Sequence, residues 1–178
     1  MTKTIILVFH PDLARSRANR ALADAAVRMA DTETVDIQSI YRDRQIDTQT
    51  EVQRLVAADR IVFQFPIQWY CPPPILQAWQ NEVLTRMFYI NHETEGRLIQ
   101  GKPLWIAATA GNTPSAYTAQ GANLLPLQDI LAPLRVMANR CGLLWREPFI
   151  VYDARRATDQ ELQATGQHYA RWLVSDQM

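Results

Sequence analysis

The alternation of apolar runs with amphipathic stretches is the feature that most constrains the fold of this chain. Four apolar runs have the composition of buried strands: Thr4–Phe9, Arg60–Pro66, Pro103–Ala110 and Pro148–Ala154. A fifth segment, Thr34–Ile40, alternates apolar and polar residues as a half-buried strand does. Five strands separated by helical patterns predict an α/β fold, in which a doubly wound parallel sheet carries helices on both faces.

Helix signals lie between and after these strands. A helical region at 124–140 contains Pro133, which predicts a kink or break, and Gly142 follows it as a C-terminal cap. In the last helix, Thr158 stands three residues before Glu161, which is the spacing of a capping box. There are no repeats, linkers or low-complexity tracts, and 178 residues suit one domain with one core.

Charge and cysteine usage exclude several classes of function. The 18 Lys and Arg residues balance 18 Asp and Glu residues, so we expect no binding of nucleic acid, while a homodimer is permitted. Cys71 and Cys141 have no metal-ligand spacing, and we expect reduced thiols rather than a disulfide. No apolar segment approaches the ~20 residues of a membrane span, so we expect a soluble, cytoplasmic protein.

Three loops are expected to meet at one edge of the predicted sheet. In a doubly wound sheet, ligands bind outside the carboxyl ends of the strands, where the strand order reverses. The loops at that edge are His10–Asn19 after the first strand, Pro66–Pro74 after the third and Thr109–Tyr117 after the fourth.

The first loop ends at a helix start that is rich in hydrogen-bond donors. Its backbone N–H groups, the Ser16 hydroxyl and the Asn19 amide can bind a phosphate, which the positive end of the helix dipole also favours. On the serine alone, a plain helix cap is the better explanation, with Arg15 and Arg17 solvated. The GxGxxG fingerprint of dinucleotide-binding turns is absent.

The second loop combines aromatic side chains with a stiff backbone. The three prolines at 72–74 restrict the chain, while Trp69 and Tyr70 supply the planar apolar surface that a small-molecule pocket needs. Taken by itself, the loop is explained equally well if Trp69 folds over the end of the sheet as part of the core.

The third loop mixes glycine with small polar residues. Gly111 permits close approach of the backbone to a ligand, and Asn112 and Thr113 offer hydrogen bonds to a polar ring edge. A plain surface turn explains this loop equally well when it is considered alone.

Together the three loops indicate a flat heterocycle that carries one phosphate, and flavin mononucleotide (FMN) fits that description. Other chemistry has little support, because His10, His92 and His168 have no metal-ligand spacing and no GxSxG nucleophile motif is present. Metal-dependent and covalent hydrolytic chemistry is therefore disfavoured.

At these loops the sequence resembles the flavodoxin-like NAD(P)H:quinone oxidoreductases, and among them the bacterial ancillary proteins of glutathione-gated potassium efflux systems. The matching stretches are "HP" at 10–11, "SRAN" at 16–19, "FPIQWYCPPPILQAWQNEVLT" at 65–85, "GKPLW" at 101–105, "SAY" at 115–117 and "ARR" at 154–156. The resemblance implies one flavodoxin-like FMN-binding domain over 1–178, with five strands in the order 2-1-3-4-5, and a homodimer.

The resemblance also implies roles for individual residues. His10 and the segment at 16–19 would surround the phosphate and ribityl chain of FMN, the segments at 66–70 and 109–112 would embrace its ring, and Tyr117 would lie beside the substrate face. The implied cofactor-binding residues are His10, Ser16, Arg17, Ala18, Asn19, Pro66, Ile67, Gln68, Trp69, Tyr70, Thr109, Ala110, Gly111 and Asn112, and the implied catalytic residue is Tyr117.

Two positions depart from the family pattern. The usual "TTGG" is here the segment at 109–112, "TAGN", so that one glycine beside the ring is lost. Asn123 stands six residues after Tyr117, where one branch of the family has histidine, and asparagine cannot take up a proton near neutral pH. Both changes are expected to weaken turnover without abolishing flavin binding.

Our leading hypothesis is an FMN-dependent NAD(P)H dehydrogenase (quinone), which passes hydride from NADH or NADPH through FMN to a quinone. The alternative is a regulatory ancillary subunit with weak or no catalysis, held at the inner face of the membrane by a potassium efflux transporter. A flavodoxin-type electron carrier is disfavoured, because such carriers are usually strongly acidic and this chain has no net charge.

Overall fold

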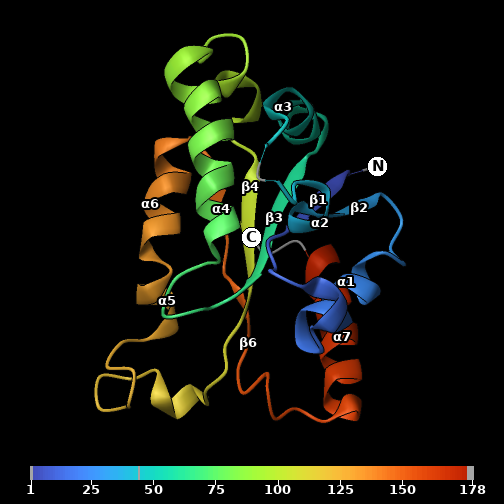
Figure 1. Ribbon diagram of the computed structural model, residues 1–178, viewed down its shortest axis with the longest axis vertical. Helices are drawn as coiled ribbons and strands as arrows, with labels where there is room; N and C mark the ends of the chain where they lie inside the picture. Colours follow the sequence, from blue (N-terminus) through green and yellow to red (C-terminus); the bar gives the residue numbers. More distant parts are fainter. Residues whose placement is uncertain (1, 44, 176–178) are drawn as a thin grey trace.

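The computed structural model describes residues 2–43 and 45–175 of the chain (Figure 1). Its strands are β1 Thr4–Val8, β2 Thr32–Asp36, β3 Arg60–Pro66, β4 Pro103–Thr109, β5 Leu144–Trp145 and β6 Phe149–Val151. Its α-helices are α1 Ala18–Ala26, α2 Ile37–Ile40, α3 Thr48–Ala57, α4 Pro74–Trp79, α5 Leu127–Ile130, α6 Ala132–Arg140 and α7 Asp159–Val174. Short 3-10 turns are η1 Leu13–Arg15, η4 Gly96–Ile99 and η5 Pro114–Ala116, and wide π-helical turns, η2 Gln80–Leu84 and η3 Arg86–Ile90, extend α4.

The strands form one parallel sheet in the order β2-β1-β3-β4-β5, with β6 beside the later part of β4. The α/β class and the doubly wound order are therefore confirmed. Strand β1 pairs with β2 on one side and with β3 on the other, so the direction of winding reverses at β1. Ligands bind at such a reversal in open parallel sheets, outside the carboxyl ends of the strands.

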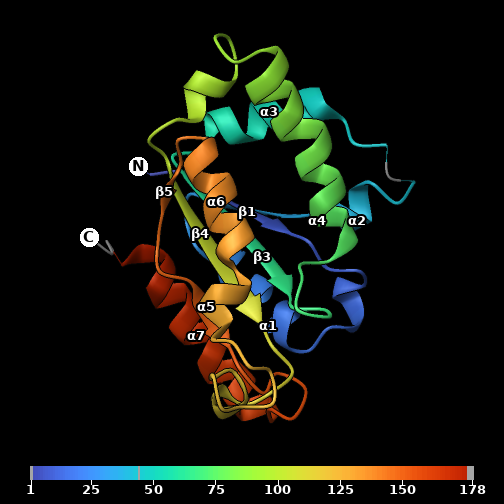
Figure 2. The ribbon, with the colours of Figure 1, turned by 90° about the vertical axis from the view of Figure 1, so that its left-hand side faces the viewer.

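Helices cover both faces of the sheet. In Figures 1 and 2, α1 and α7 lie on one side of the strands and α4 and α6 lie on the other. The residues of β1 alternate accordingly: Ile6 and Val8 pack with α1 and α7, whereas Ile5 and Leu7 pack with α3, α4 and α6. Because both faces are buried, β1 is apolar along its whole length, which is why it stood out as a continuous run in the sequence.

Two of the predicted strands differ from the observed ones. The prediction for Thr34–Ile40 is wrong at its end, because the Asp36 carboxylate accepts the Ser39 N–H at 3.2 Å and caps α2. The prediction for Pro148–Ala154 is confirmed only at its centre, β6. The sheet also gains the short strand β5, and Pro148, which has no N–H to donate, lies between β5 and β6.

Several local predictions are confirmed. The predicted helical region at 124–140 is helical only from Leu127 and breaks at Leu131 into α5 and α6. Pro133 lies in the first turn of α6, and Gly142 has a φ of +66°. Thr158 and Glu161 form the capping box of α7. Cys71 and Cys141 are free thiols. Within 2–43 and 45–175, no helix is both long and apolar enough to cross a membrane.

Candidate functional site

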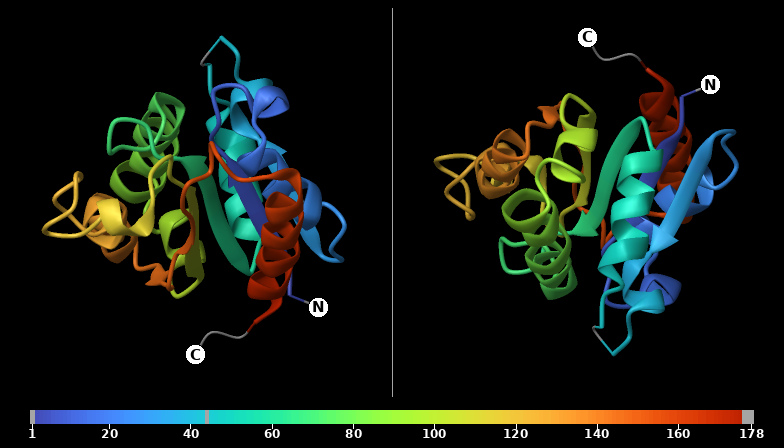
Figure 3. Two further views of the ribbon diagram at one scale, coloured as in Figure 1. Left: turned by 90° about the horizontal axis from the view of Figure 1, so that it is seen from below. Right: turned by 90° about the horizontal axis from the view of Figure 1, so that it is seen from above.

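A cleft of about 430 Å³ lies at the carboxyl ends of β1, β3 and β4. The left panel of Figure 3, seen from below, shows the loops that follow β1, β3, β4 and β6 gathered around this edge. The cleft is lined by most of the predicted cofactor-binding residues: His10, Ser16, Arg17, Ala18, Asn19, Pro66, Ile67, Gln68, Thr109, Ala110 and Gly111. Arg15, Ala154 and Arg155 complete the lining and were not among the predicted site residues.

The start of α1 supplies hydrogen-bond donors to the cleft. The Ser16 hydroxyl accepts the Asn19 N–H at 3.2 Å, so the serine caps the first turn even though α1 itself begins at Ala18. The N–H groups of Arg17 and Ala18 have no acceptor among the described residues. Such groups, at the positive end of a helix, bind anions.

A buried hydrogen-bonded network lies beneath the cleft and joins three elements. The Asn19 amide in α1 donates to the Thr109 hydroxyl in β4 at 2.8 Å. Gln64 in β3 donates from Nε2 to the Asn19 carbonyl at 2.8 Å, while its own Oε1 has no partner among the described residues. All three side chains are buried, so the network fixes α1 relative to β3 and β4.

The sequence reasoning did not single out Gln64. The sequence does contain a signal for this residue, because Gln64 is polar and stands in the middle of the apolar run Arg60–Pro66. In the folded chain Gln64 is fully buried. A buried polar side chain needs partners, and the partner of this one is Asn19, which itself lines the cleft.

The cleft is positively charged. Arg15, Arg17 and Arg155 line it, and none of the described residues in its lining is Asp or Glu. Arg17 forms an ion pair with Asp159 at 2.7 Å, whereas Arg15 and Arg155 have no carboxylate partner within the described ranges. A positive cleft in a chain of zero net charge indicates an anionic ligand.

His10 is held as a neutral imidazole. Its Nδ1 accepts the Asp12 N–H at 3.0 Å, which leaves Nε2 as the atom that carries the proton. Burial lowers the pKa of His10, and the nearby carboxylates of Asp36 and Asp12 only partly offset that effect.

The segment after β3 forms a tight turn with unusual backbone angles. Gln68 and Cys71 exchange backbone hydrogen bonds at 2.8 and 3.0 Å, and the two residues between them, Trp69 and Tyr70, have φ angles of +48° and +64°. Trp69 is 93% exposed, so the alternative that it belongs to the core is wrong. The Tyr70 hydroxyl donates to Asn123 Oδ1 at 3.2 Å, and neither aromatic residue is part of the cleft lining.

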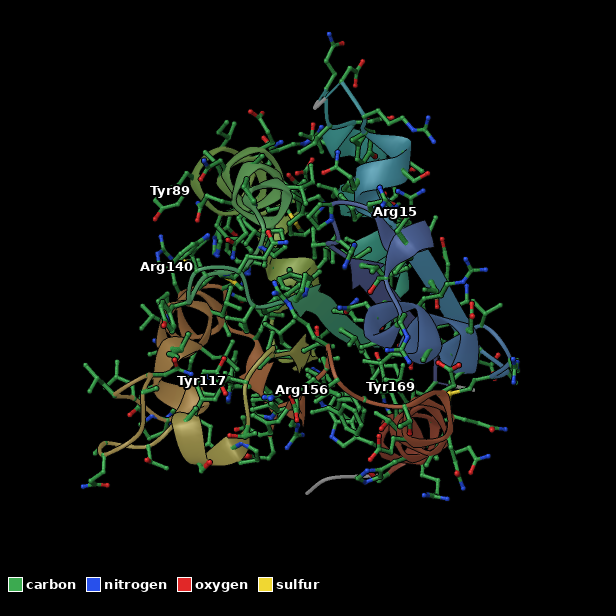
Figure 4. All side chains as sticks on the ribbon, turned by 60° about the horizontal axis from the view of Figure 1, so that its bottom comes forward. Arg15, Tyr89, Tyr117, Arg140, Arg156 and Tyr169 are labelled. Carbon is green, nitrogen blue, oxygen red and sulfur yellow. The ribbon has the colours of Figure 1, made fainter. Side chains whose placement is uncertain are left out.

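Tyr117 lies behind the cleft rather than in its lining. It is 8% exposed and packs against Tyr152 with ring centroids 5.6 Å apart, in a small cluster with Ala110 and Ile67. Burial raises the pKa of Tyr117, and the neighbouring Tyr70 and Tyr152 add to the effect, so the hydroxyl keeps its proton at neutral pH. Figure 4 shows Arg15 and Tyr117 on opposite sides of the strand ends.

Asn112 closes the loop after β4 instead of lining the cleft. Its Oδ1 accepts the Thr113 N–H at 2.9 Å, and its carbonyl accepts the Asp153 N–H at 2.9 Å. The N–H groups of Gly111 and Asn112 have no acceptor in the part of the chain that the structure describes. This loop therefore also presents free donors next to the cleft.

Three larger hollows are present among the described residues, and the smallest of the three, about 480 Å³, lies between β6 and α7. A groove of about 710 Å³ runs between α1 and α7, and one of about 670 Å³ runs between the helix at 74–90 and α6. The 710 Å³ groove adjoins the cleft at Arg15, Ser16 and Arg17, but none of the three hollows lies across the carboxyl ends of the central strands, where the three predicted loops converge. The smaller cleft therefore remains the candidate site.

The fold and the cleft define a class of protein, and comparison with known proteins agrees. The family model described as "Flavodoxin-like fold" matches residues 2–173. The chain belongs to this family, and the resemblance stated from its sequence is confirmed.

Individual relatives make the likeness more specific. An uncharacterized NAD(P)H oxidoreductase, YdeQ, from Bacillus subtilis is 35% identical over 97% of this chain and 87% of its own length. The glutathione-regulated potassium-efflux system ancillary protein KefG from Cronobacter sakazakii is 36% identical over 97% and 92%. The crystal structure of general stress protein 14 from Treponema denticola in complex with FMN is 28% identical over 96% and 97%, with a TM-score of 0.88.

Proposed function

We propose that this protein is an FMN-dependent NAD(P)H:quinone oxidoreductase. The observation that carries the proposal is the positively charged cleft at the carboxyl ends of β1, β3 and β4, which has free N–H donors and no carboxylate among its described lining residues. The relatives named as an NAD(P)H oxidoreductase and as an FMN complex support the same assignment.

The residues at the cleft fit the parts of FMN. In this proposal the Ser16 hydroxyl, the free N–H groups of Arg17 and Ala18, and the cation of Arg15 hold the phosphate, and His10 contacts the ribityl chain. The ring occupies the space between the segments at 66–70 and 109–112. FMN supplies the two-electron redox chemistry when it is bound.

The chain itself supplies orientation and hydrogen bonds. The Gln64–Asn19–Thr109 network keeps the phosphate-binding turn at a fixed position relative to β4. Tyr117 holds a proton on its hydroxyl, because burial raises its pKa, and that hydroxyl donates to a quinone oxygen when the acceptor enters. We further propose that 1–178 acts as one FMN-binding domain, as a homodimer in the cytoplasm.

Visible absorption spectroscopy tests this function. We expect the purified protein, or the apoprotein titrated with FMN, to show bound-flavin absorbance, and to oxidise NADH or NADPH when a quinone is added. A protein that takes up no FMN and oxidises neither dinucleotide contradicts the proposal.

The likeness to KefG favours a second candidate function. At 36% identity over nearly the whole chain, that relative supports the role of an ancillary subunit for a potassium efflux transporter, at the inner face of the membrane. Co-purification with a co-expressed transporter of that class tests the role, and potassium efflux should rise when both are present. The two functions are compatible, because a reductase can also serve as a subunit.

A further inference from the structure

Arg155 lies against the glycine of the third loop. A Cβ atom built on Gly111 would lie 3.6 Å from Arg155 Nε and 3.7 Å from Arg155 Cδ, so the side chain runs across the open face of that glycine. Both residues line the cleft. Arg155 thus brings a permanent positive charge to the wall formed by the loop after β4.

The backbone on both sides of this contact is held firmly. Ala154 donates its N–H to the Ala110 carbonyl at 3.0 Å, and Asp153 donates its N–H to the Asn112 carbonyl at 2.9 Å. These bonds clamp the segment before α7 onto the loop after β4. The position of the Arg155 Cα is therefore set by the same residues that form the wall of the cleft.

The neighbouring arginine provides a direct contrast. Arg156 forms an ion pair with Asp153 at 2.7 Å and does not line the cleft, although Figure 4 shows it at the same edge of the sheet. Arg155 has no carboxylate partner among the described residues, so its charge is not neutralised within the chain. Arg156 is therefore paired with a carboxylate, whereas its neighbour Arg155 carries its positive charge at the cleft.

Arg155 lies against the loop that borders the flavin ring in the proposed function. In that proposal the ring occupies the space between the segments at 66–70 and 109–112, and Gly111 belongs to the second of these segments. The guanidinium group beside Gly111 is therefore a neighbour of the ring in this arrangement.

We propose that Arg155 is a cofactor-contacting residue that stabilises the negative charge of the reduced flavin ring and so raises the affinity of the protein for reduced over oxidised FMN. This inference rests on the proposed function. Hydride transfer moves two electrons and one proton from NAD(P)H to the ring, releases NAD(P)⁺ and leaves one additional negative charge on the ring. A fixed cation beside the ring favours the reduced state without itself taking up a proton.

The midpoint potential of the bound flavin tests the proposal, with Arg155→Met as the variant and Arg156→Met as its matched control. We expect the Arg155→Met variant to lose about tenfold in relative affinity for reduced FMN, which lowers the two-electron potential by ~30 mV. Arg155→Lys, which keeps the charge, should retain most of the potential, and Arg156→Met should leave it unchanged.

Titrations with FMN and with riboflavin distinguish the possible outcomes. If the wild-type protein binds neither, the proposed function itself fails. If FMN binds but the Arg155→Met and wild-type potentials agree, the inference about Arg155 is overturned. A loss of affinity for FMN with unchanged affinity for riboflavin would assign Arg155 to the phosphate and would overturn it as well.

Discussion

The α1 wall of the cleft and the aromatic turn beside the cleft differ in how their residues are held. On the α1 wall, the side chains of Asn19, Gln64 and Thr109 are buried and joined by hydrogen bonds of 2.8 Å. The turn at 68–71, here called the aromatic wall, lies beside the cleft and not in its lining. Its residues Trp69 and Tyr70 have positive φ angles, and Trp69 is almost completely exposed. The first wall is held by buried hydrogen bonds, while the second has a strained backbone with little packing on Trp69.

This difference indicates that the two regions have different functions in the proposed enzyme. The buried hydrogen bonds of the α1 wall fix the position of its backbone. A fixed position suits the cofactor phosphate, which does not take part in the redox reaction. Strained backbone at non-glycine residues is found mainly at functional sites. Exposed aromatic rings suit contact with a ligand that binds and dissociates, as an electron acceptor does. We therefore assign cofactor retention to the α1 wall and contact with the acceptor to the aromatic wall.

Breaking the buried network should produce the largest effect. Gln64→Met removes the side-chain donor to the Asn19 carbonyl, so the free energy of unfolding should fall by about 0.5–1.5 kcal/mol. The affinity for FMN should fall as well, because Asn19 lines the cleft. Urea denaturation of the apoprotein and FMN titration measure the two effects.

Gln77→Met is the matched control for that variant. Gln77 is exposed, and its amide bonds only to Asn81 on the same helix, so the control should change the free energy of unfolding by less than about 0.5 kcal/mol. Equal effects from the two substitutions would show that the α1 wall is not specially held.

Removing the Tyr117 hydroxyl should give an intermediate effect on catalysis. Tyr117→Phe eliminates one hydrogen bond to the acceptor, and kcat/KM for a quinone should fall about tenfold, while the FMN dissociation constant stays unchanged. Tyr152→Phe, at the ring that packs on Tyr117, is the control and should retain turnover. Unchanged steady-state kinetics in Tyr117→Phe would remove Tyr117 from the mechanism.

Relieving the strained turn should stabilise the protein slightly. Trp69→Asn places a residue that tolerates positive φ where an exposed aromatic side chain now stands, so the free energy of unfolding should rise by about 1 kcal/mol. Trp69→Phe keeps the strain and should show no such gain in thermal or urea denaturation. Quinone turnover should fall in Trp69→Asn, and a fully active variant would argue against the assigned role of the aromatic wall.

The smallest effect concerns His10 and pH. Because burial lowers the pKa of His10, the unfolded chain takes up this proton at a higher pH than the folded chain does. The stability that neutral His10 contributes is therefore present above its ordinary pKa of 6.5 and declines as the pH falls through the range below that value. Urea denaturation at several pH values should give a shallower decline for His10→Asn, and an unchanged slope would contradict this account.

The strands and loops of the site could largely be predicted because their signals are local. The runs Thr4–Phe9, Arg60–Pro66 and Pro103–Ala110 are apolar on both faces, and this pattern is rare outside buried parallel strands. By contrast, the end of β2 was mispredicted, because the Asp36 side chain caps a short helix whose Ile37 is as apolar as a strand residue. A pattern of apolar residues does not distinguish these two structures over so few positions.

The amino-acid sequence by itself determined the α/β class, the three loops at one edge of the sheet and most of the residues that line the cleft. Only the tertiary structure decided that Arg155 faces Gly111, that Gln64 supports Asn19 and that Trp69 is exposed. The reason is physical: apolar periodicity and chain order are properties of neighbouring residues. Which charge remains unpaired, and which polar group finds a partner, depends on residues brought together from distant parts of the chain.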